Sequence, residues 1–163
     1  MSIHVRRATE KDTDRVLLML HEVLELHAKI RPDIFISGTT KYTKEELAER
    51  FKNDETPFFV AVNDEDTAVG YACCAIKKQP FSTNMKQFDT LFIDDLCVDG
   101  GCRGQHIGQT LFAFVMQYAK ELGCYDVTLN VWEGNDSARA FYEKMGMFVK
   151  ETQMEILVNE SSN

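Results

Sequence analysis

The apolar positions of the chain fall into two kinds of pattern. Between residues 16 and 27 they recur at the three- and four-residue spacing of an amphipathic helix, which Pro32 helps to end. The signature Thr43-x-x-Glu46 predicts the start of a second, short helix. Apolar runs at 57–62 and 68–76, separated by the polar turn 63–66, predict a hairpin, and a further short strand is expected at 3–7.

The second half of the chain alternates strands with helices. Residues 91–98 are an apolar run interrupted by Asp94 and Asp95, which favours a central strand. A helical pattern then runs to Gly123, a strand is expected at 127–132, and a helix from Asn135 ends at Gly146. Residues 148–158 are expected to supply one or two last strands. The order β-α-α-β-β-β-α-β-α-β predicts one mixed α/β domain over 1–163, with an ordered core at about 3–158.

The amino-acid composition narrows the classes of protein to which this chain can belong. With 163 residues, 44% of them hydrophobic and 27% charged, the sequence is typical of an ordinary soluble globular domain. No apolar run approaches the roughly 18 residues of a membrane span. The first residues show no apolar signal core, so we expect a cytoplasmic protein with no membrane partner.

Charge and cysteine usage exclude several kinds of site. The net charge of −8 argues against nucleic-acid binding; it would suit a cationic partner, although solubility alone explains it more simply. The cysteine count is odd and shows no C-x-x-C pair, so neither a disulfide framework nor a zinc site is expected, and we predict no metal. The five cysteines are Cys73, Cys74, Cys97, Cys102 and Cys124.

The segment C-R-G-Q-H-I-G-Q-T-L, which starts at Cys102, leads from the strand at 91–98 into a helix. A helix N-terminus presents unpaired N–H groups to an anion, and Arg103 adds a positive charge. The glycine spacing fits neither a P-loop nor a dinucleotide fingerprint. Taken alone, the segment is equally compatible with a flexible turn and a solvent-facing arginine.

A second motif lies downstream, in N-D-S-A-R-A-F-Y-E-K-M-G. On a helix, Asn135, Ala138 and Tyr142 share one face, and small Ala138 leaves room for a ligand along it. Two simpler interpretations stay open, because Asn135 is also a common helix N-cap residue and Tyr142 can be a core tyrosine.

Together the two motifs resemble those of the GCN5-related N-acetyltransferase (GNAT) family. The family's loop Gln/Arg-x-x-Gly-x-Gly/Ala is matched by 103–108, except that His106 replaces the first glycine. The pattern N-x-x-A-x-x-F-Y-x-x-x-G is matched in register by 135–146. The resemblance implies a mixed central sheet that splays between two parallel strands and is flanked by helices. It also implies acetyl-coenzyme A as co-substrate.

The resemblance assigns a set of residues to acetyl-coenzyme A binding. Backbone amides of the strand would pair with the pantetheine arm, the loop would hold the pyrophosphate, and Tyr142 would protonate the departing thiolate, which its ordinary pKa near 10 permits. The residues are Leu96, Cys97, Val98, Arg103, Gly104, Gln105, His106, Ile107, Gly108, Gln109, Thr110, Asn130, Asn135, Ala138 and Tyr142.

The acceptor is expected to be a primary amine, which needs a base because its pKa is also near 10. Asp94 and Asp95 are the candidates, and strand geometry predicts that only one of them faces the cleft. Resemblance to the Glu-Asp pair of polyamine acetyltransferases would make Asp94 the base; a purely structural role for both is the alternative. Cys97 is expected to be a buried structural thiol, which favours direct transfer over an acyl-enzyme.

These observations favour an acetyl-coenzyme A-dependent N-acetyltransferase. Acidity and the Asp94–Asp95 pair slightly favour a small cationic acceptor, similar to a polyamine or an aminoglycoside. A protein or peptide amine is the nearest alternative, and a non-catalytic acyl-coenzyme A sensor is another. The resemblance leaves a homodimer open, with 152–158 as an edge for pairing. His106 is interpreted as a tolerated departure that keeps its backbone amide and adds an imidazole near the phosphates.

Overall fold

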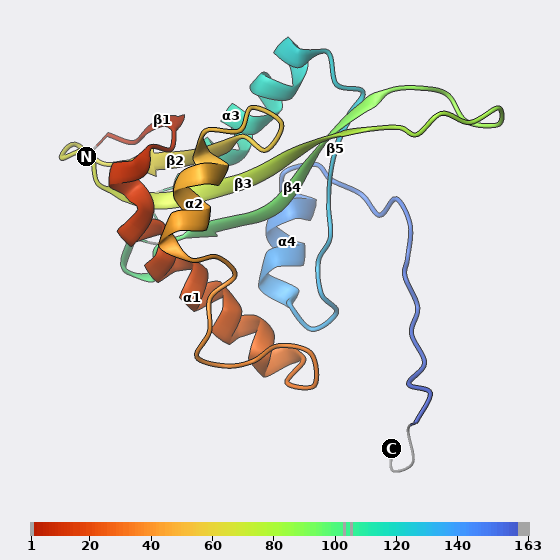
Figure 1. Cartoon of the computed structure of the whole chain (residues 1–163), viewed down its shortest axis with the longest axis horizontal. Helices are drawn as coiled ribbons and strands as arrows, with labels where there is room; N and C mark the ends of the chain where they lie inside the picture. The colour runs from red at the N-terminus through yellow and green to blue at the C-terminus, as the bar shows by residue number, and fades with distance from the viewer. Residues whose placement is uncertain (1, 103, 105, 160–163) are drawn as a thin grey trace.

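The computed structural model describes residues 2–102, 104 and 106–159. Within them, five strands form one sheet in the order β1-β2-β3-β4-β5, antiparallel except for the parallel pair β4 and β5 (Figure 1). The strands are β1 (His4–Arg7), β2 (Phe58–Val62), β3 (Ala68–Lys78), β4 (Asp89–Val98) and β5 (Asp126–Leu129).

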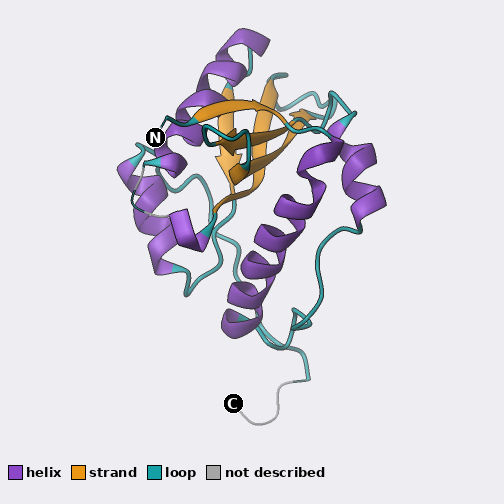
Figure 2. Cartoon of the chain, turned by 90° about the vertical axis from the view of Figure 1, so that its left-hand side faces the viewer, coloured by secondary structure: helices purple, strands orange, loops and turns teal. Residues whose placement is uncertain are grey.

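Helices cover both faces of this sheet (Figure 2). One apolar cluster joins the sheet to α1 (Thr13–Ile30) and α2 (Lys44–Phe51). A second cluster on the opposite face includes α3 (Ile107–Leu122) and residues of α4 (Asp136–Lys144). Two short 3-10 helices, Glu10–Asp12 and Gly100–Cys102, complete the elements. The predicted mixed α/β sheet with flanking helices is therefore confirmed.

Local signals define several helix ends as predicted. The Glu46 amide donates to the Thr43 hydroxyl at 3.1 Å, and the Thr43 amide donates to the Glu46 carboxylate at 2.8 Å, so the expected capping box is present. Gly123 ends α3 with φ of 78°, a left-handed conformation that glycine adopts without steric cost.

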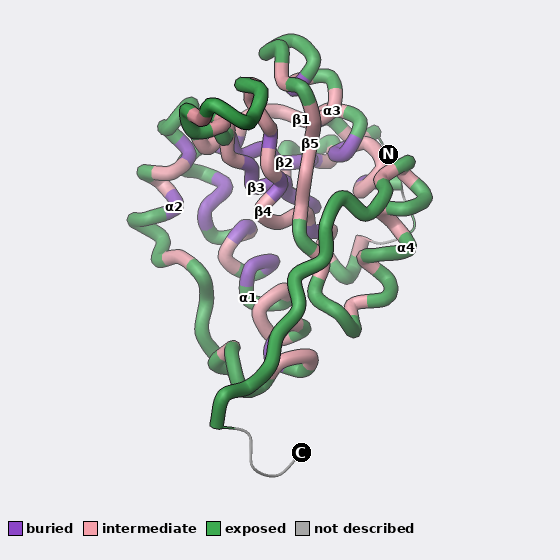
Figure 3. The backbone as a smooth tube through the Cα atoms, turned by 90° about the vertical axis from the view of Figure 1, so that its right-hand side faces the viewer, coloured by how far each residue is buried: buried purple, intermediate pink, exposed green. Residues whose placement is uncertain are grey.

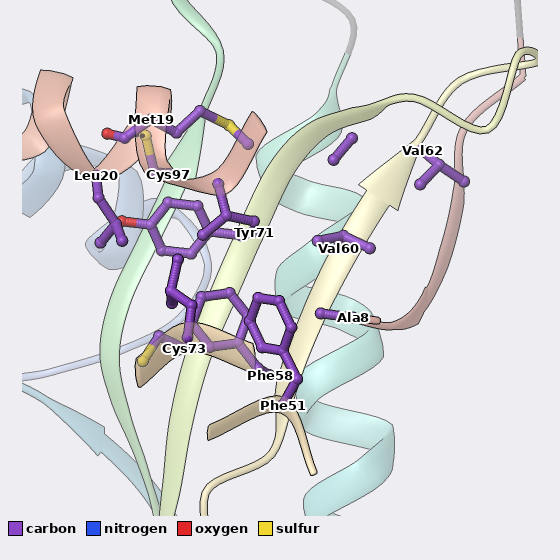
Figure 4. Close-up of a cluster of buried hydrophobic side chains, with 13 residues drawn as sticks. Ala8, Met19, Leu20, Phe51, Phe58, Val60, Val62, Tyr71, Cys73 and Cys97 are labelled. Atoms are coloured by element: carbon purple, nitrogen blue, oxygen red, sulfur yellow. Dashed lines mark hydrogen bonds between the residues drawn. The ribbon is translucent and has the colours of Figure 1, made fainter. Parts of the chain in front are cut away.

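The core on the α1 and α2 side is aromatic and tightly closed (Figure 4). Phe58 stacks on Tyr71 with ring centroids 5.3 Å apart, and Phe51 meets Phe58 edge-on at 4.8 Å. Cys97 of β4 is only 8% exposed and its sulfur lies 3.9 Å from the carbonyl oxygen of Met19 in α1. The thiol is therefore packed among core residues between β4 and α1.

The sheet splays at the parallel pair, as predicted. β4 and β5 pair from Thr90–Asp126 to Ile93–Leu129 and then part. At the same point β4 carries a bulge: Cys74 pairs with Ile93 and Cys73 with Asp95, so Asp94 is the extra residue. The strand predicted at 127–132 therefore ends early, at Leu129, because β4 turns away from it.

The strands predicted at 148–158 are wrong for the described chain. Residues 148–158 are extended in outline but carry no strand assignment, and they lie exposed beyond β5 (Figure 3). The apolar alternation there is typical of a strand, but a strand also needs a neighbour to complete its hydrogen bonds. Within this chain the segment pairs with none.

Candidate active site

The carboxylates of Asp94 and Asp95 converge on one ammonium group. Lys41, from the loop between α1 and α2, contacts Asp94 and lies 3.5 Å from the nearer Asp95 oxygen. The expectation that the two aspartates point to opposite faces is therefore wrong. The bulge explains it, because the extra residue interrupts the alternation and lets two consecutive side chains reach the same side of the sheet.

The two aspartates differ in their surroundings. The side chain of Asp95 is 14% exposed and that of Asp94 is 30% exposed. Burial raises the pKa of Asp95 to about 6, assisted by the charge of Asp94 and opposed by Lys41. Burial also acts to lower the pKa of Lys41, but the charges of Asp95 and Asp94 outweigh it, so that pKa is raised. The Lys41 ammonium group therefore lies beside a carboxylate, that of Asp95, whose pKa is close to neutral pH.

Tyr142 of α4 approaches the same region from the opposite layer. Its ring packs against Phe141 at 5.2 Å and Phe112 at 6.4 Å between ring centroids. Burial and then the charge of Asp95 raise the pKa of the phenol above its ordinary value. The hydroxyl therefore keeps its proton at neutral pH and can donate it.

Two residues before α3 have a left-handed backbone. His106 has φ of 59° and Gly104 has φ of 88°, both left-handed, so the chain turns sharply into the helix. No side chain among the described residues caps the first amides of α3. Those of Ile107, Gly108 and Gln109 therefore stay available to a ligand. Arg103 and Gln105 lie outside the described residues.

Gly108 serves packing as well as the loop. A Cβ at this position would lie 3.2 Å from two ring carbons of Phe141, so glycine lets α3 and α4 approach closely. Thr110 is committed inside its own helix, because its amide and its hydroxyl both donate to the His106 carbonyl, at 3.0 and 2.9 Å. Its assignment to coenzyme A binding, at the end of the run of loop amides, stays a prediction.

The two asparagines expected on the far side of the cleft have different surroundings. Asn130 follows the last residue of β5 directly and is exposed at the splay. Asn135 acts as the N-cap of α4, since its side-chain oxygen accepts a hydrogen bond from the Ala138 amide at 3.3 Å. This hydrogen bond supports the simpler interpretation of Asn135 as a helix N-cap.

The edge of β4 completes the site. Past Ile93, the β4 residues Leu96, Cys97 and Val98 pair with β3 on one side only, because β5 ends at Leu129. In the described chain no strand lies along the other edge. Backbone N–H and C=O groups on that edge can therefore pair with an extended ligand, as a strand would.

Sequence analysis missed two features next to the acid pair. Lys41 lies in an irregular loop with no motif around it, so nothing in the sequence indicated that it would reach β4. Tyr71 is fully buried on β3, with its hydroxyl pointing toward Leu20 in Figure 4 and without a hydrogen-bond partner in the described part of the chain. A buried polar group of this kind usually indicates an unfilled contact, for instance with water.

This arrangement of parting parallel strands, an acid pair, a tyrosine and open helix amides defines a class of acyl-transfer protein. A family model described as the acetyltransferase (GNAT) family matches residues 20–147. The chain belongs to this family, whose members take the acetyl group from acetyl-coenzyme A, and it is accordingly an N-acetyltransferase.

Three relatives illustrate the range of the match. Over 149 residues the chain is 30% identical to the peptidyl-lysine N-acetyltransferase YjaB of Salmonella typhimurium, covering 91% of this chain and 86% of that one. A 62-residue stretch, 38% of this chain, is 40% identical to the glucosamine 6-phosphate N-acetyltransferase of Arabidopsis thaliana and covers 40% of it. A mutant of the BH1408 protein from Bacillus halodurans matches with a TM-score of 0.90 at 30% identity, over 95% and 99% of the two chains.

The described part of the chain contains neither a membrane-spanning helix nor a cluster of metal-ligating side chains. None of its helices combines the length and apolar character needed to cross a membrane. No group of three or more histidine, cysteine, aspartate or glutamate side chains in it is placed to hold a metal ion.

Proposed function

We propose that this protein transfers an acetyl group directly from acetyl-coenzyme A to the side-chain amine of a peptidyl lysine. Asp95 acts as the base and Tyr142 as the acid. The observation that carries the acceptor assignment is Lys41. Lys41, a lysine side chain carried by a loop of the chain between α1 and α2, contacts both carboxylates of the acid pair, as the side chain of an acceptor lysine would.

The donor side of the site fits the residues present. The unpaired edge of β4 suits the amide groups of a pantetheine arm. The open amides at the start of α3 suit a pyrophosphate, with the left-handed His106 turning the chain around it. One amide on the β4 edge would also stabilise the oxyanion that develops on the thioester carbonyl.

The chemistry requires two proton movements, one on each side of the acetyl group. The acceptor ammonium gives a proton to Asp95, and the free amine attacks the carbonyl carbon. The carbon–sulfur bond then breaks, and Tyr142 gives its proton to the departing thiolate. Each group starts in the state that it needs: Asp95, with a pKa of about 6, is largely ionised at pH 7.5, and the raised pKa of Tyr142 keeps it protonated.

We assign the base to Asp95, although resemblance alone favoured Asp94. Asp95 is the more buried of the two, and its charge is among the influences on the pKa of Tyr142. Because the pKa of Asp95 is raised above its ordinary value, proton transfer to it from an ammonium group is less unfavourable than to an ordinary carboxylate. Asp94 would then hold the incoming ammonium, as it now holds Lys41.

Lys41 also reduces the negative charge that the acid pair offers to a cationic acceptor. The acid pair suggested a small polycation, but one of its two negative charges is already balanced by Lys41. The similarity to a peptidyl-lysine acetyltransferase extends over 91% of this chain, which supports the peptide acceptor further. A small cationic amine remains the second candidate, favoured by the net charge of −8.

The packed thiol of Cys97 supports direct transfer. It lies between β4 and α1 with only 8% of the residue exposed, which leaves a thioester carbonyl little room to approach its sulfur. An acyl-enzyme on Cys97 would require the core on the α1 side to open.

An amine panel tests the proposed acceptor. Purified protein is incubated with acetyl-coenzyme A and, separately, a lysine-containing peptide, the same peptide with arginine at that position, a polyamine and glucosamine 6-phosphate. Release of free thiol is followed in each case. We expect the highest kcat/KM with the lysine peptide and no release with the arginine peptide. A preference for the polyamine would assign the second candidate, and thiol release with no amine would contradict direct amine transfer.

A further inference from the structure

We infer that Lys41 is an internal acceptor, which the active site of its own chain acetylates once. The inference rests on the proposed function, because it uses the same donor, base and acid. It goes further in that it assigns a modification site to a lysine of this chain. The Lys41 amine would then be a substrate of the site, and its contact with the acid pair would be the contact that precedes the reaction.

The amine of Lys41 lies where an acceptor amine is needed. It contacts the Asp94 carboxylate, and its nitrogen lies 3.5 Å from the nearer oxygen of Asp95, the proposed base. The side chain is 39% exposed, so it is not sealed in the core. The other lysines that form ion pairs in the described chain have different partners; the neighbouring Lys44, for example, pairs with Asp14 at 3.1 Å.

The donor would reach the same place from the other end of β4. Because α3 starts after the C-terminal end of β4, an arm whose pyrophosphate lies on the α3 amides would run back along the free edge of β4, from Val98 toward Leu96. Leu96 follows Asp95 directly, and neighbouring Cα atoms are about 3.8 Å apart. The thioester at the end of the arm would therefore lie beside the carboxylate that Lys41 approaches.

The α1–α2 loop holds Lys41 in its position. The Glu25 carboxylate of α1 accepts hydrogen bonds from the Ser37 hydroxyl and the Gly38 amide, both at 2.6 Å. On the other side of Lys41, the Thr43 capping box fixes the start of α2. The two helices lie over the same face of the sheet (Figure 1). Because amine and base belong to one folded unit, the step needs no encounter between two chains.

The step follows the course proposed for acetyl transfer. Asp95 takes a proton from the Lys41 ammonium, and the free amine attacks the thioester carbonyl carbon, so that a carbon–nitrogen bond forms. The carbon–sulfur bond breaks, and Tyr142 gives its proton to the thiolate. A second proton from the nitrogen restores the Tyr142 phenol, and the proton on Asp95 passes to solvent. The products are acetylated Lys41, coenzyme A and one proton.

The reaction would stop after one acetyl group on each chain. The acetamide carries no charge, so it cannot keep the ion pairs of Lys41 with Asp94 and Asp95, and it has no amine left to acetylate. The acid pair would then be open to an ammonium group from outside. Thiol release without added amine should therefore end at one equivalent, and only continuing release, from hydrolysis of the thioester, would contradict direct amine transfer.

The test uses the full chain with acetyl-coenzyme A and no added amine. Acetyl groups are counted over time by intact-protein mass spectrometry and mapped after proteolysis. Lys41→Arg and Lys44→Arg are a matched pair, since both keep the positive charge and lie close together in sequence. We expect one acetyl group on Lys41 in the wild type and in Lys44→Arg, with a rate constant that dilution of the protein does not change, and none in Lys41→Arg. Asp95→Asn should slow the reaction by about 100-fold or more.

Several outcomes would overturn the inference. Acetyl groups spread over exposed lysines such as Lys52, or acetylation of Lys41 that Asp95→Asn leaves unchanged, would indicate chemical modification by the thioester. A rate constant that rises with protein concentration would indicate transfer between chains. An unmodified Lys41 in an enzyme that turns over the lysine peptide would refute the internal acceptor and leave the proposed function standing. An unmodified Lys41 in an enzyme that acetylates no amine would refute both.

Discussion

The extra residue of the β4 bulge, Asp94, determines which side of the sheet the two carboxylates of the acid pair reach. Without the bulge, Asp94 and Asp95 would alternate across the sheet, and one of them would face α3. With it, both carboxylates reach the α1 side, where Lys41 lies between them. The arrangement places a buried carboxylate, a second carboxylate and a cation side by side, and it is the reason why we propose Asp95 as the base.

Burial of the ionised Asp95 carboxylate should lower the free energy of unfolding at neutral pH. Its folded-state pKa of about 6 lies above the ordinary value of 3.8, so the folded protein binds the proton more tightly than the unfolded chain. The contribution of this group to stability is full below about pH 4 and is lost as the pH rises through 6. Asp95→Asn should therefore raise the free energy of unfolding at pH 7.5 by on the order of 1–2 kcal/mol, and by less at pH 5.

Urea unfolding at the two pH values measures this difference. Asp94→Asn is the control, because it also removes one Lys41 contact but leaves Asp95 in place. If Asp95→Asn lowers stability equally at both pH values, the ionised carboxylate is stabilised by Lys41 rather than strained by burial, and its selection as the base loses support.

At the scale of elements, the start of α3 requires a left-handed backbone conformation at a residue other than glycine. His106 occupies the left-handed region at φ of 59°, where the family pattern has glycine. Histidine tolerates this region better than most residues, and a β-branched side chain tolerates it worst. The replacement therefore keeps the turn and its amides.

Substitutions at His106 should separate backbone strain from phosphate binding. His106→Gly removes the steric cost but adds freedom to the unfolded chain, so stability should stay within about 1 kcal/mol of wild type. His106→Val should destabilise the fold by about 1–2 kcal/mol. Denaturant midpoints measure both. We also expect only a modest change in KM for acetyl-coenzyme A with His106→Gly, whereas complete loss of binding would make the imidazole essential.

The helices and most strands could be predicted because their signals are local. Capping at Thr43, the glycine stop at 123 and the cap at Asn135 each depend on neighbours a few residues away. The strands expected at 148–158 could not be settled in the same way. The apolar alternation there is typical of a strand, but a strand also needs a neighbouring edge, and local sequence does not show whether the fold offers one.

At the scale of the whole molecule, the site is assembled from distant parts. The acid pair comes from β4, Tyr142 from α4 and Lys41 from the loop before α2. Motif spacing predicts the residues of the donor half, since those of the loop and the helix lie close in sequence. It did not locate Lys41, because that contact spans 53 residues and depends on how α1 and α2 pack over the sheet.

The central claim is that Tyr142 protonates the leaving thiolate while Asp95 takes the proton of a peptidyl amine. The most direct test is turnover of the lysine peptide by Tyr142→Phe, with Tyr118→Phe as the matched control. Tyr118 lies on α3 and packs against Phe59, with ring centroids 4.9 Å apart. Loss of a positioned acid should lower kcat by between about 100- and 10,000-fold, with KM for acetyl-coenzyme A little changed and Tyr118→Phe close to wild type. A Tyr142→Phe enzyme that retains wild-type kcat would contradict the account.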